Sequence, residues 1–414
     1  MAKQNKPAIR FKGFTDAWEQ RKLSEMCGTF EYGLNAAAKE FDGKNKYIRI
    51  TDIDDASREF LLSDLSSPDI CLDGMSKYLL SSGDIVFART GASVGKTYIY
   101  RENDGIVYFA GFLIRAKVNQ DNDAEFVFQS TLSPSYEKYI RITSQRSGQP
   151  GVNAQEYGEY DLFAPSKEEQ QRIGHFLRGI DSLITLHQRK YDKLQVLKKA
   201  MLEKMFPKNG SSVPEIRFKG FTDAWEQRKL GEMGQTYTGL SGKTKDDFGH
   251  GQARFVTYMN VFSNPISNPE MTEPIEIDPK QNEVEVGDVF FTTSSETPEE
   301  VGMSSILLEK RGKTYLNSFC FGFRPSEKID SYYLAYMLRS ESARAKITLL
   351  AQGISRYNIS KNKVMEIAVS LPSLDEQKMI GQYFSQLDHL ITLHQRELEK
   401  LQNIKKSMLE KMFV

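Results

Sequence analysis

The chain has 414 residues and a mass of 47.3 kDa, which is too long for one ordinary domain and predicts two or three. Hydrophobic residues make up 39% and charged residues 27%, as in soluble globular proteins, and no apolar run approaches the ~20 residues that a membrane span needs. The formal net charge is +0, whereas nucleic-acid binders usually carry a basic excess, so any DNA-binding surface must be local or shared with a partner.

The first recognisable segment covers residues 10–23 and recurs without a change 207 residues later, at 217–230. The stretches 184–189 and 202–206 recur at the same offset, as 391–396 and 409–413. Fourteen identical consecutive residues cannot arise by chance, so the chain is an internal duplication with two copies. Trp18 and Trp225 lie inside the repeated segments, and we expect both to be packing anchors at the start of a domain.

Between the repeated ends, residues 24–153 and 231–358 are nearly unrelated in sequence. Faint landmarks are shared: Gly83-Asp84 beside Gly287-Asp288, and Gly148 with Asn153 beside Gly353 with Asn358. Short β-rich runs at 47–51, 84–87 and 289–292 are bounded by turn residues, and helical patterns follow Asp123 and Asp330. Each interior is therefore predicted to be a compact mixed α and β domain. Constant ends around divergent interiors indicate a fixed scaffold with two variable modules, since drift after a recent duplication would erode both parts alike.

A long helix is predicted after each interior. Ser166 with Glu169, and Ser373 with Glu376, have the spacing of a capping box, in which the serine and the glutamate bond each other's backbone N–H groups. Beyond each cap the seam positions step by four and three, which is typical of a coiled coil: 173, 177, 180, 184, 187, 191, 194, 198, 201 and 205 in the first copy, and 380, 384, 387, 391, 394, 398, 401, 405, 408 and 412 in the second. Lys198 and Lys405 fall on this seam, where they would destabilise a simple dimer unless they pack at its edge or mark a docking site.

These observations predict an α+β chain with an internal two-fold duplication, in which two mixed domains are separated by a pair of long coiled-coil helices. The predicted ranges are 1–165 for the first domain, 166–206 for its helix, 207–213 for a linker, 214–372 for the second domain and 373–414 for its helix.

This layout resembles the specificity subunits of type I restriction–modification systems. The resemblance is carried by the stretches 163–173 (FAPSKEEQQRI) and 370–380 (SLPSLDEQKMI) and by the Gly-Asp landmarks, and it covers essentially the whole chain. It implies a non-catalytic, cytoplasmic protein with two target-recognition domains, each reading one half of a bipartite, asymmetric site in double-stranded DNA. It also implies that the two helices pack antiparallel and act as a spacer between the half-sites.

The resemblance further implies partner subunits. Two modification subunits would dock on the helices and bring S-adenosylmethionine for adenine N6-methylation, while restriction subunits would add ATP- and Mg²⁺-dependent translocation and cleavage. This chain itself is then expected to hold no cofactor and no metal. A helix over residues 166–206 would be ~60 Å long at about 1.5 Å per residue, enough to hold two domains over successive major grooves of DNA, whose turn is ~34 Å.

The candidate DNA contacts are basic and amide side chains, mostly just before each long helix. Arginine reads guanine and glutamine reads adenine in the major groove, while lysine and other arginines hold phosphates. The alternative is an ordinary solvated helix surface. The candidates are Arg89, Lys96, Lys138, Arg141, Gln145, Arg146 and Gln149 in the first domain, and Arg339, Arg344, Lys346, Gln352 and Arg356 in the second.

Motifs for catalysis are absent from the sequence or incomplete in it. Residues 91–97 (GASVGKT) are like a phosphate-binding loop but have three residues between the glycines, where four are needed. No Pro-Pro pair occurs, although an adenine methyltransferase would be expected to carry one. Cys27, Cys71 and Cys320 are odd in number and far apart, which argues against disulfides and metal binding. The alternative function is a duplicated coiled-coil scaffold that does not read DNA.

Overall fold

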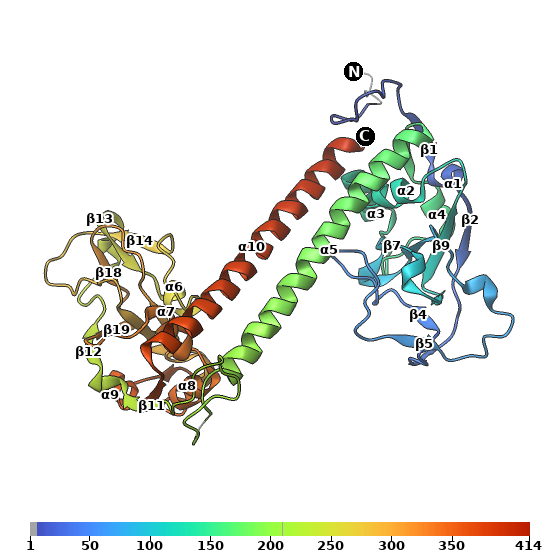
Figure 1. Ribbon diagram of the computed structural model, residues 1–414. Helices are drawn as coiled ribbons and strands as arrows, with labels where there is room; N and C mark the ends of the chain where they lie inside the picture. The colour runs from blue at the N-terminus through green and yellow to red at the C-terminus, as the bar shows by residue number, and fades with distance from the viewer. Residues whose placement is uncertain (1–5, 209) are drawn as a thin grey trace. The chain divides into compact units, whose positions relative to one another are not determined.

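The computed structural model describes residues 6–208 and 210–414; residues 1–5 and Asn209, which belongs to the predicted linker, lie outside the described residues. The chain forms two compact units (Figure 1): unit 1 consists of Met1–Arg189 with Gln395–Val414, and unit 2 of Lys190–His394. The two long helices, α5 (Lys167–Lys204) and α10 (Leu374–Met412), each contribute to both units. Within the described residues, no helix is long and apolar enough to cross a membrane.

Unit 1 is built on a four-stranded antiparallel sheet in the order β2-β9-β6-β7. Smaller pairings join β1 to β10, β3 to β5 and, in parallel, β4 to β8. Its strands are β1 Glu19–Lys22, β2 Cys27–Tyr32, β3 Ala38–Glu40, β4 Lys46–Ile48, β5 Ser66–Pro68, β6 Ile85–Ala88, β7 Thr97–Ile99, β8 Val107–Phe109, β9 Leu113–Val118 and β10 Asp161–Ala164. Its short helices are α1 Leu23–Met26, α2 Ala124–Ser130, α3 Pro134–Thr143 and α4 Ala154–Gly158.

Unit 2 repeats this plan with a four-stranded sheet in the order β12-β19-β15-β17. The other pairings are β11 with β21, β16 with β20, and β13 with β14 and, in parallel, β18. Its strands are β11 Glu226–Lys229, β12 Gly234–Thr238, β13 Phe248–Val256, β14 Thr272–Ile275, β15 Val289–Thr292, β16 Ser294–Ser295, β17 Ser304–Ile306, β18 Thr314–Leu316, β19 Cys320–Pro325, β20 Tyr357–Asn358 and β21 Ala368–Leu371. Its short helices are α6 Tyr258–Ser263, α7 Ser331–Met337, α8 Glu341–Thr348 and α9 Lys361–Met365. The duplication therefore extends to the interiors, although their sequences are nearly unrelated.

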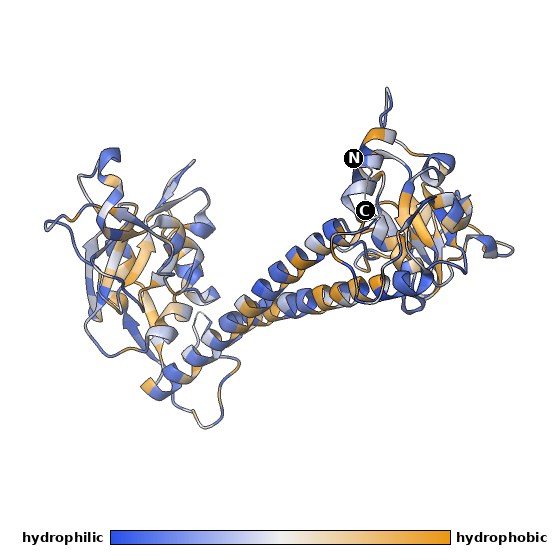
Figure 2. Cartoon of the chain, turned by 90° about the horizontal axis from the view of Figure 1, so that it is seen from above, coloured by the Kyte–Doolittle hydropathy of each residue, from blue (hydrophilic) through white to orange (hydrophobic). Residues whose placement is uncertain are grey.

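The predicted strands at 84–87 and 289–292 are central strands with both faces buried. In β6, Ile85 and Phe87 belong to the core shared with the long helices, while Val86 and Ala88 belong to a second core on the opposite face. Strand β15 divides its residues in the same way. Successive side chains of a strand point to opposite faces, so burial on both faces explains the unbroken apolar runs. Figure 2 shows apolar residues, in orange, gathered on strands inside each unit.

The predicted helices after Asp123 and Asp330 are confirmed as α2 and α7. The two aspartates cap them by accepting the N–H groups of Phe126 and Tyr333 at 2.8 and 2.9 Å. The predicted strand at 47–51 is shorter than expected, because Arg49 and Asp52 close a turn right after β4.

The capping boxes predicted for the long helices form only in part. Ser373 accepts the N–H of Glu376 at 3.4 Å, but the buried Glu376 side chain binds Arg217 at 2.7 Å instead of reaching back to the backbone. Glu169 binds Arg10 at 2.7 Å in the same way. A buried carboxylate is better satisfied by a bidentate guanidinium than by one N–H. These ion pairs fasten the identical segments 10–23 and 217–230 to the helix starts.

Within each unit, a segment of α5 lies antiparallel to a segment of α10. In unit 1, Ile173 and Leu177 share a core with Leu409 and Met412, and in unit 2 Met205 and Phe206 share one with Ile380 and Phe384. The seam lysines are partnered across the pair and bridge aspartates, Lys405 to Asp181 in unit 1 and Lys198 to Asp388 in unit 2, each at 2.5 Å. The expected destabilisation is therefore offset, since each charge faces an opposite one.

Both tryptophans are buried anchors, as predicted. Trp225 packs edge-on against Phe206 with ring centroids 6.3 Å apart, and Trp18 packs edge-on against Phe413 at 6.5 Å. In unit 2 the two rings belong to consecutive segments of the chain. In unit 1 they come from opposite ends of the described chain, where Ile9 N–H also donates to the carbonyl of Lys411 at 3.0 Å. The C-terminal end of α10 thus covers the tryptophan of unit 1, as the C-terminal end of α5 covers the tryptophan of unit 2.

Candidate nucleic-acid interface

Three loops of unit 1 are joined by backbone hydrogen bonds just beyond the end of β6. Arg89 donates its N–H to the carbonyl of Phe112 at 3.0 Å and accepts the N–H of Val152 at 2.9 Å, and Gly91 donates to Pro150 at 3.0 Å. We call the loops 89–91, 110–112 and 149–152 the first loop cluster. Loops positioned by a rigid sheet are the usual location of binding residues.

Unit 2 has the same arrangement beyond the end of β15. Thr293 donates to the carbonyl of Phe319 at 2.9 Å and accepts the N–H of Ile359 at 2.9 Å, and β16 pairs with β20. The loops 293–295, 317–319 and 352–359 form the second loop cluster. The two interiors, although nearly unrelated in sequence, therefore each form a loop cluster, and the two clusters lie at equivalent positions in their units.

The side chains of the first loop cluster combine cationic, amide and aromatic groups. The guanidinium of Arg89 lies over the ring of Tyr32, 5.0 Å from its centroid. Tyr32, Arg49, Arg89 and Phe112 line an open cavity of about 590 Å³. Gln149 is exposed and sits against Gly91, since a Cβ added at Gly91 would lie 2.9 Å from its side-chain Nε2. The structure therefore brings Arg89 and Gln149 together in the first loop cluster.

The other candidates of unit 1 differ in their surroundings. Lys138, Arg141 and Gln145 have exposed side chains on or just after α3. Arg146 is exposed but binds Glu156 at 2.5 Å and the carbonyl of Thr143 at 2.8 Å. Lys96 binds Asp55 at 2.5 Å and is only 16% exposed, so most of its charge is already balanced within the unit.

In unit 2, three of the predicted candidates donate to backbone carbonyls of their own unit. The guanidinium of Arg339 donates to the carbonyl oxygens of Ser304, Val261 and Phe262 at 2.7–3.0 Å, and burial lowers its pKa. Arg344 donates to backbone carbonyls between residues 299 and 302 at 2.6–2.8 Å, and burial lowers its pKa to about 10.

Lys346 donates to the carbonyl of Ala368 at 2.8 Å, and burial lowers its pKa too. Arg339 and Arg344 thus direct their guanidinium donors to backbone acceptors inside the fold, whereas the half-buried Lys346 directs one of its three ammonium donors in this way. The spacing of basic residues could not reveal that they point inward. Gln352 and Arg356, in contrast, are exposed in the second loop cluster.

Sequence reasoning missed the aromatic residues of the clusters. Phe112 and Phe319 lie 207 residues apart, like the identical ends, and are 59% and 55% exposed. A second missed signal is the pair Gly33-Leu34, which recurs as Gly239-Leu240. A residue-by-residue alignment of the two interiors would have revealed both signals.

The segment 91–97 is a structural turn with its own backbone partners. Its N–H groups at Val94, Gly95 and Lys96 donate to the carbonyls of Gly91, Ala88 and Ser93 at 3.0–3.1 Å, so they do not form a cradle for phosphate. Gly95 has a positive φ of 83° and faces Ile140, which leaves no room for a side chain.

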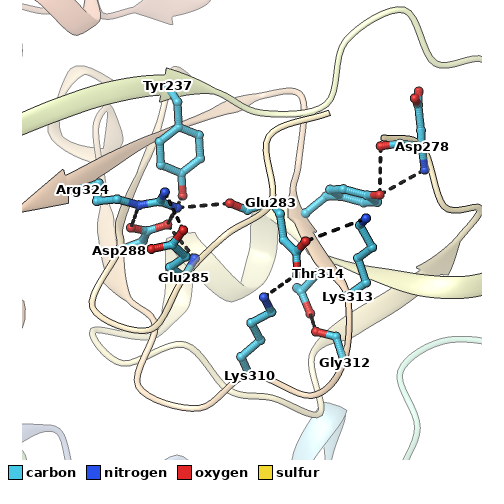
Figure 3. A network of polar contacts seen from close by, with 11 residues as sticks. Tyr237, Asp278, Glu283, Glu285, Asp288, Lys310, Gly312, Lys313, Thr314 and Arg324 are labelled. Atoms are coloured by element: carbon cyan, nitrogen blue, oxygen red, sulfur yellow. Dashed lines mark hydrogen bonds and ion pairs between the residues drawn. The ribbon is translucent and has the colours of Figure 1, made fainter. Parts of the chain in front are cut away.

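The Gly-Asp landmarks are structural as well. Buried Asp288 accepts the guanidinium of Arg324 and the N–H of Glu285, both at 2.8 Å, and the hydroxyl of Tyr237 at 2.5 Å (Figure 3). Burial and the Asp288 charge raise the pKa of Tyr237. Asp84 accepts the N–H of Ser81 at 2.9 Å in the equivalent turn. Both aspartates thus fix the entry to a central strand. In the described parts of the chain, no group of His, Cys, Asp or Glu side chains is arranged to hold a metal ion.

Comparisons with known proteins agree with this doubled geometry. Residues 15–196 and 222–403 each match the model of the type I restriction modification DNA specificity domain. A protein of Methanocaldococcus jannaschii, proposed to be the specificity subunit of the type I restriction enzyme MjaX, is 24% identical over 95% of this chain and 92% of its own length.

Two solved structures share the fold. The S subunit of a type I restriction–modification system from M. genitalium has a TM-score of 0.59 at 14% identity, with 99% of both chains covered. A chain from a study of complex assembly and conformational transition in the type I system has a TM-score of 0.50 at 16% identity, covering 95% of this chain and 96% of that one.

Proposed function

Because this chain belongs to the family of type I restriction–modification DNA specificity proteins, with one specificity domain in each half, we propose that each loop cluster reads one half of a bipartite DNA site. The observation that carries the proposal is the pair of matching clusters, built on a shared fold from loops whose sequences differ. Equivalent positions place the two surfaces alike, while different side chains let them recognise different bases.

In this proposal Arg89, Gln149, Gln352 and Arg356 are the candidate base contacts, since all four belong to the loop clusters. Lys138, Arg141 and Gln145, which are exposed on or just after α3, are candidate phosphate or base contacts. Local clusters of this kind reconcile DNA binding with a net charge of +0, because the loops that form the two clusters contain no Asp or Glu.

Members of this family are the non-catalytic subunits of their complexes, and the chain is therefore a component of a larger assembly. We assign adenine methylation with S-adenosylmethionine to two modification subunits, and translocation and cleavage with ATP and Mg²⁺ to restriction subunits. We place the assembly in the cytoplasm. The internally bonded turn at 91–97 supports the assignment of ATP to a partner.

An exchange of interiors tests the proposal. Residues 24–153 are replaced by the equivalent segment of another family member, and the complex with its modification subunits is examined by methylome sequencing. We expect one half-site to change and the other to remain, because each unit reads its own half. The matched control exchanges residues 231–358 and should alter the other half only. Changes in both half-sites after either exchange would contradict the proposal.

A further inference from the structure

Phe112 and Phe319 hold the same place in the two loop clusters. Each directly precedes a central strand, β9 or β19, and each carbonyl accepts the N–H of the residue that leaves the neighbouring central strand, Arg89 or Thr293. Both side chains remain more than half exposed. The apolar Ile354 is also exposed in the second cluster, but its counterpart one residue after the shared glycine is Gln149, so it has no apolar match.

The loops that carry these rings are held by a close backbone approach. Gly33 and Gly239 donate to the carbonyls of Leu113 and Cys320 at 3.1 and 3.3 Å. A Cβ at Gly33 would lie 2.2 Å from the carbonyl oxygen of Ala110, and one at Gly239 would lie 2.1 Å from that of Asn317. Only glycine allows this approach, so each ring is presented from a fixed platform.

An exposed phenylalanine forgoes the stabilisation that burial would bring, and a single case would need no explanation. Here a phenylalanine is left exposed in both units, at equivalent positions, in loops whose sequences otherwise differ. The loops of each cluster also carry hydrogen-bond donors, among them Arg89 and Gln149 in the first cluster and Arg356 in the second. A cluster that combines such donors with one exposed ring is complementary to a partner surface that is mostly polar but carries one apolar group.

The base-pair edges in the major groove of DNA have that character. The groups there are mostly hydrogen-bond donors and acceptors, and the C5 methyl group of thymine is the apolar group that an apolar side chain contacts. A wedge between stacked bases would need a ring that projects freely, whereas Phe112 and Phe319 are each nearly half covered by their own unit.

We propose that Phe112 and Phe319 are matched specificity residues, each of which contacts the C5 methyl group of a thymine in the half-site read by its own unit. This inference rests on the proposed function and adds the chemical group that each cluster selects. It predicts at least one thymine in each half-site.

The test uses the full chain in complex with its modification subunits and a DNA duplex carrying the mapped site. Each thymine is replaced in turn by deoxyuridine, which lacks only the methyl group, and the affinity is measured by fluorescence anisotropy. For the wild type we expect one position in each half-site at which deoxyuridine weakens binding about fourfold, equivalent to about 0.8 kcal/mol for one methyl group.

In Phe112→Ala the penalty for deoxyuridine should disappear in the first half-site and persist in the second, and Phe319→Ala should show the reverse. The dependence of affinity on salt should stay unchanged, because no phosphate contact is removed. Ile106→Ala and Val286→Ala are matched controls, since these exposed residues precede β8 and β15 and so lie at the opposite ends of the strands that lead into the clusters. Both controls should keep the two penalties.

The inference is overturned if the wild type shows no deoxyuridine penalty, if a half-site lacks thymine, or if the penalty persists after the matching phenylalanine is removed. These outcomes differ from failure of the proposed function. If the wild-type complex does not prefer its mapped site over a scrambled duplex, the proposed function itself fails.

Discussion

Arg339 and Arg356 have the same chemistry but different surroundings in unit 2. Arg339 supplies donors to backbone carbonyls of residues 261, 262 and 304, whereas Arg356 is exposed in the second loop cluster. Sequence reasoning placed both at the DNA, because a basic residue near a variable loop looks the same whether it points inward or outward. The direction of a side chain depends on the packing of its helix, which spacing alone does not reveal.

We expect Arg339→Ala to lower the free energy of unfolding by about 2–4 kcal/mol, because buried carbonyls lose a charged donor. Arg356→Ala should change it by less than about 0.5 kcal/mol, as is usual for exposed residues, but should weaken DNA binding. Urea denaturation of the chain and DNA-binding titrations of the complex measure the two effects. Equal stability of the two variants would contradict the structural role of Arg339.

At the scale of elements, an ion pair joins the two long helices within each unit, and these two pairs are related by the 207-residue repeat. Lys198 binds Asp388 in unit 2, and Asp388 also accepts the hydroxyl of Tyr336 at 2.8 Å. Lys405 binds Asp181 in unit 1, where Gln129 is the additional donor at 2.7 Å. A charged pair on an apolar seam favours one register of the helices, because a slipped register leaves both charges unpaired.

A double-mutant cycle on Lys198→Ala and Asp388→Ala tests this role. We expect each single variant to lose about 1–3 kcal/mol of unfolding free energy and the cycle to give a coupling of about 1 kcal/mol. Charge reversal, Lys198→Asp with Asp388→Lys, should recover part of the loss. Additive single effects in urea denaturation would show that the pair does not set the register.

The spacer hypothesis also belongs to the helices and remains a prediction. One heptad inserted after Leu194 and another after Leu401 keeps the apolar seam and lengthens each helix by about 10 Å, or ~3 base pairs of a ~34 Å turn. Methylation mapping should show a longer spacer, or binding should fail because the rotational phase is lost. As a control, four-residue insertions at the same points interrupt the heptad and should destabilise the helix pair. Full activity with the original spacer after the heptad insertions would exclude the hypothesis.

At the scale of the molecule, the sequence alone predicts what repeats and what is periodic. The duplication, the helix seams, the tryptophan anchors and the central strands all have such signals, and the structure confirms them. The loop clusters have no such signal, because they arise from backbone hydrogen bonds between segments such as 89–91 and 149–152 that are distant in sequence. The glutamates of the predicted caps were misassigned for the same reason, since their partners Arg10 and Arg217 are remote along the chain.

Because the ion pair between the helices occurs in both copies, a fragment containing only the first copy can test whether two copies of it pair with two-fold symmetry. A fragment that ends near residue 209 contains both Asp181 and Lys198, the first-copy equivalents of Asp388 and Lys405. An antiparallel homodimer could therefore form both pairs between its two copies, and it should recognise an inverted repeat of the first half-site, as two-fold symmetry requires. Light scattering and methylation mapping measure mass and site. Asp181→Lys should disrupt the dimer and added Lys198→Asp should restore it. A dimer that still recognises the original asymmetric site would refute the symmetry argument.

The packing of Phe413 against Trp18 also determines when unit 1 can mature. On the ribosome, residues are added at about 5–20 per second and domains generally fold as they emerge, the first one first. The core of unit 1 includes Leu409 and Met412, which are synthesised after all of unit 2. Unit 1 is thus completed after unit 2, and about 10–45 s pass at that rate between the synthesis of residue 189 and that of Phe413, which joins Phe126 against Trp18. Until Phe413 is synthesised, the apolar site around Trp18 lacks this ring and is accessible to chaperones.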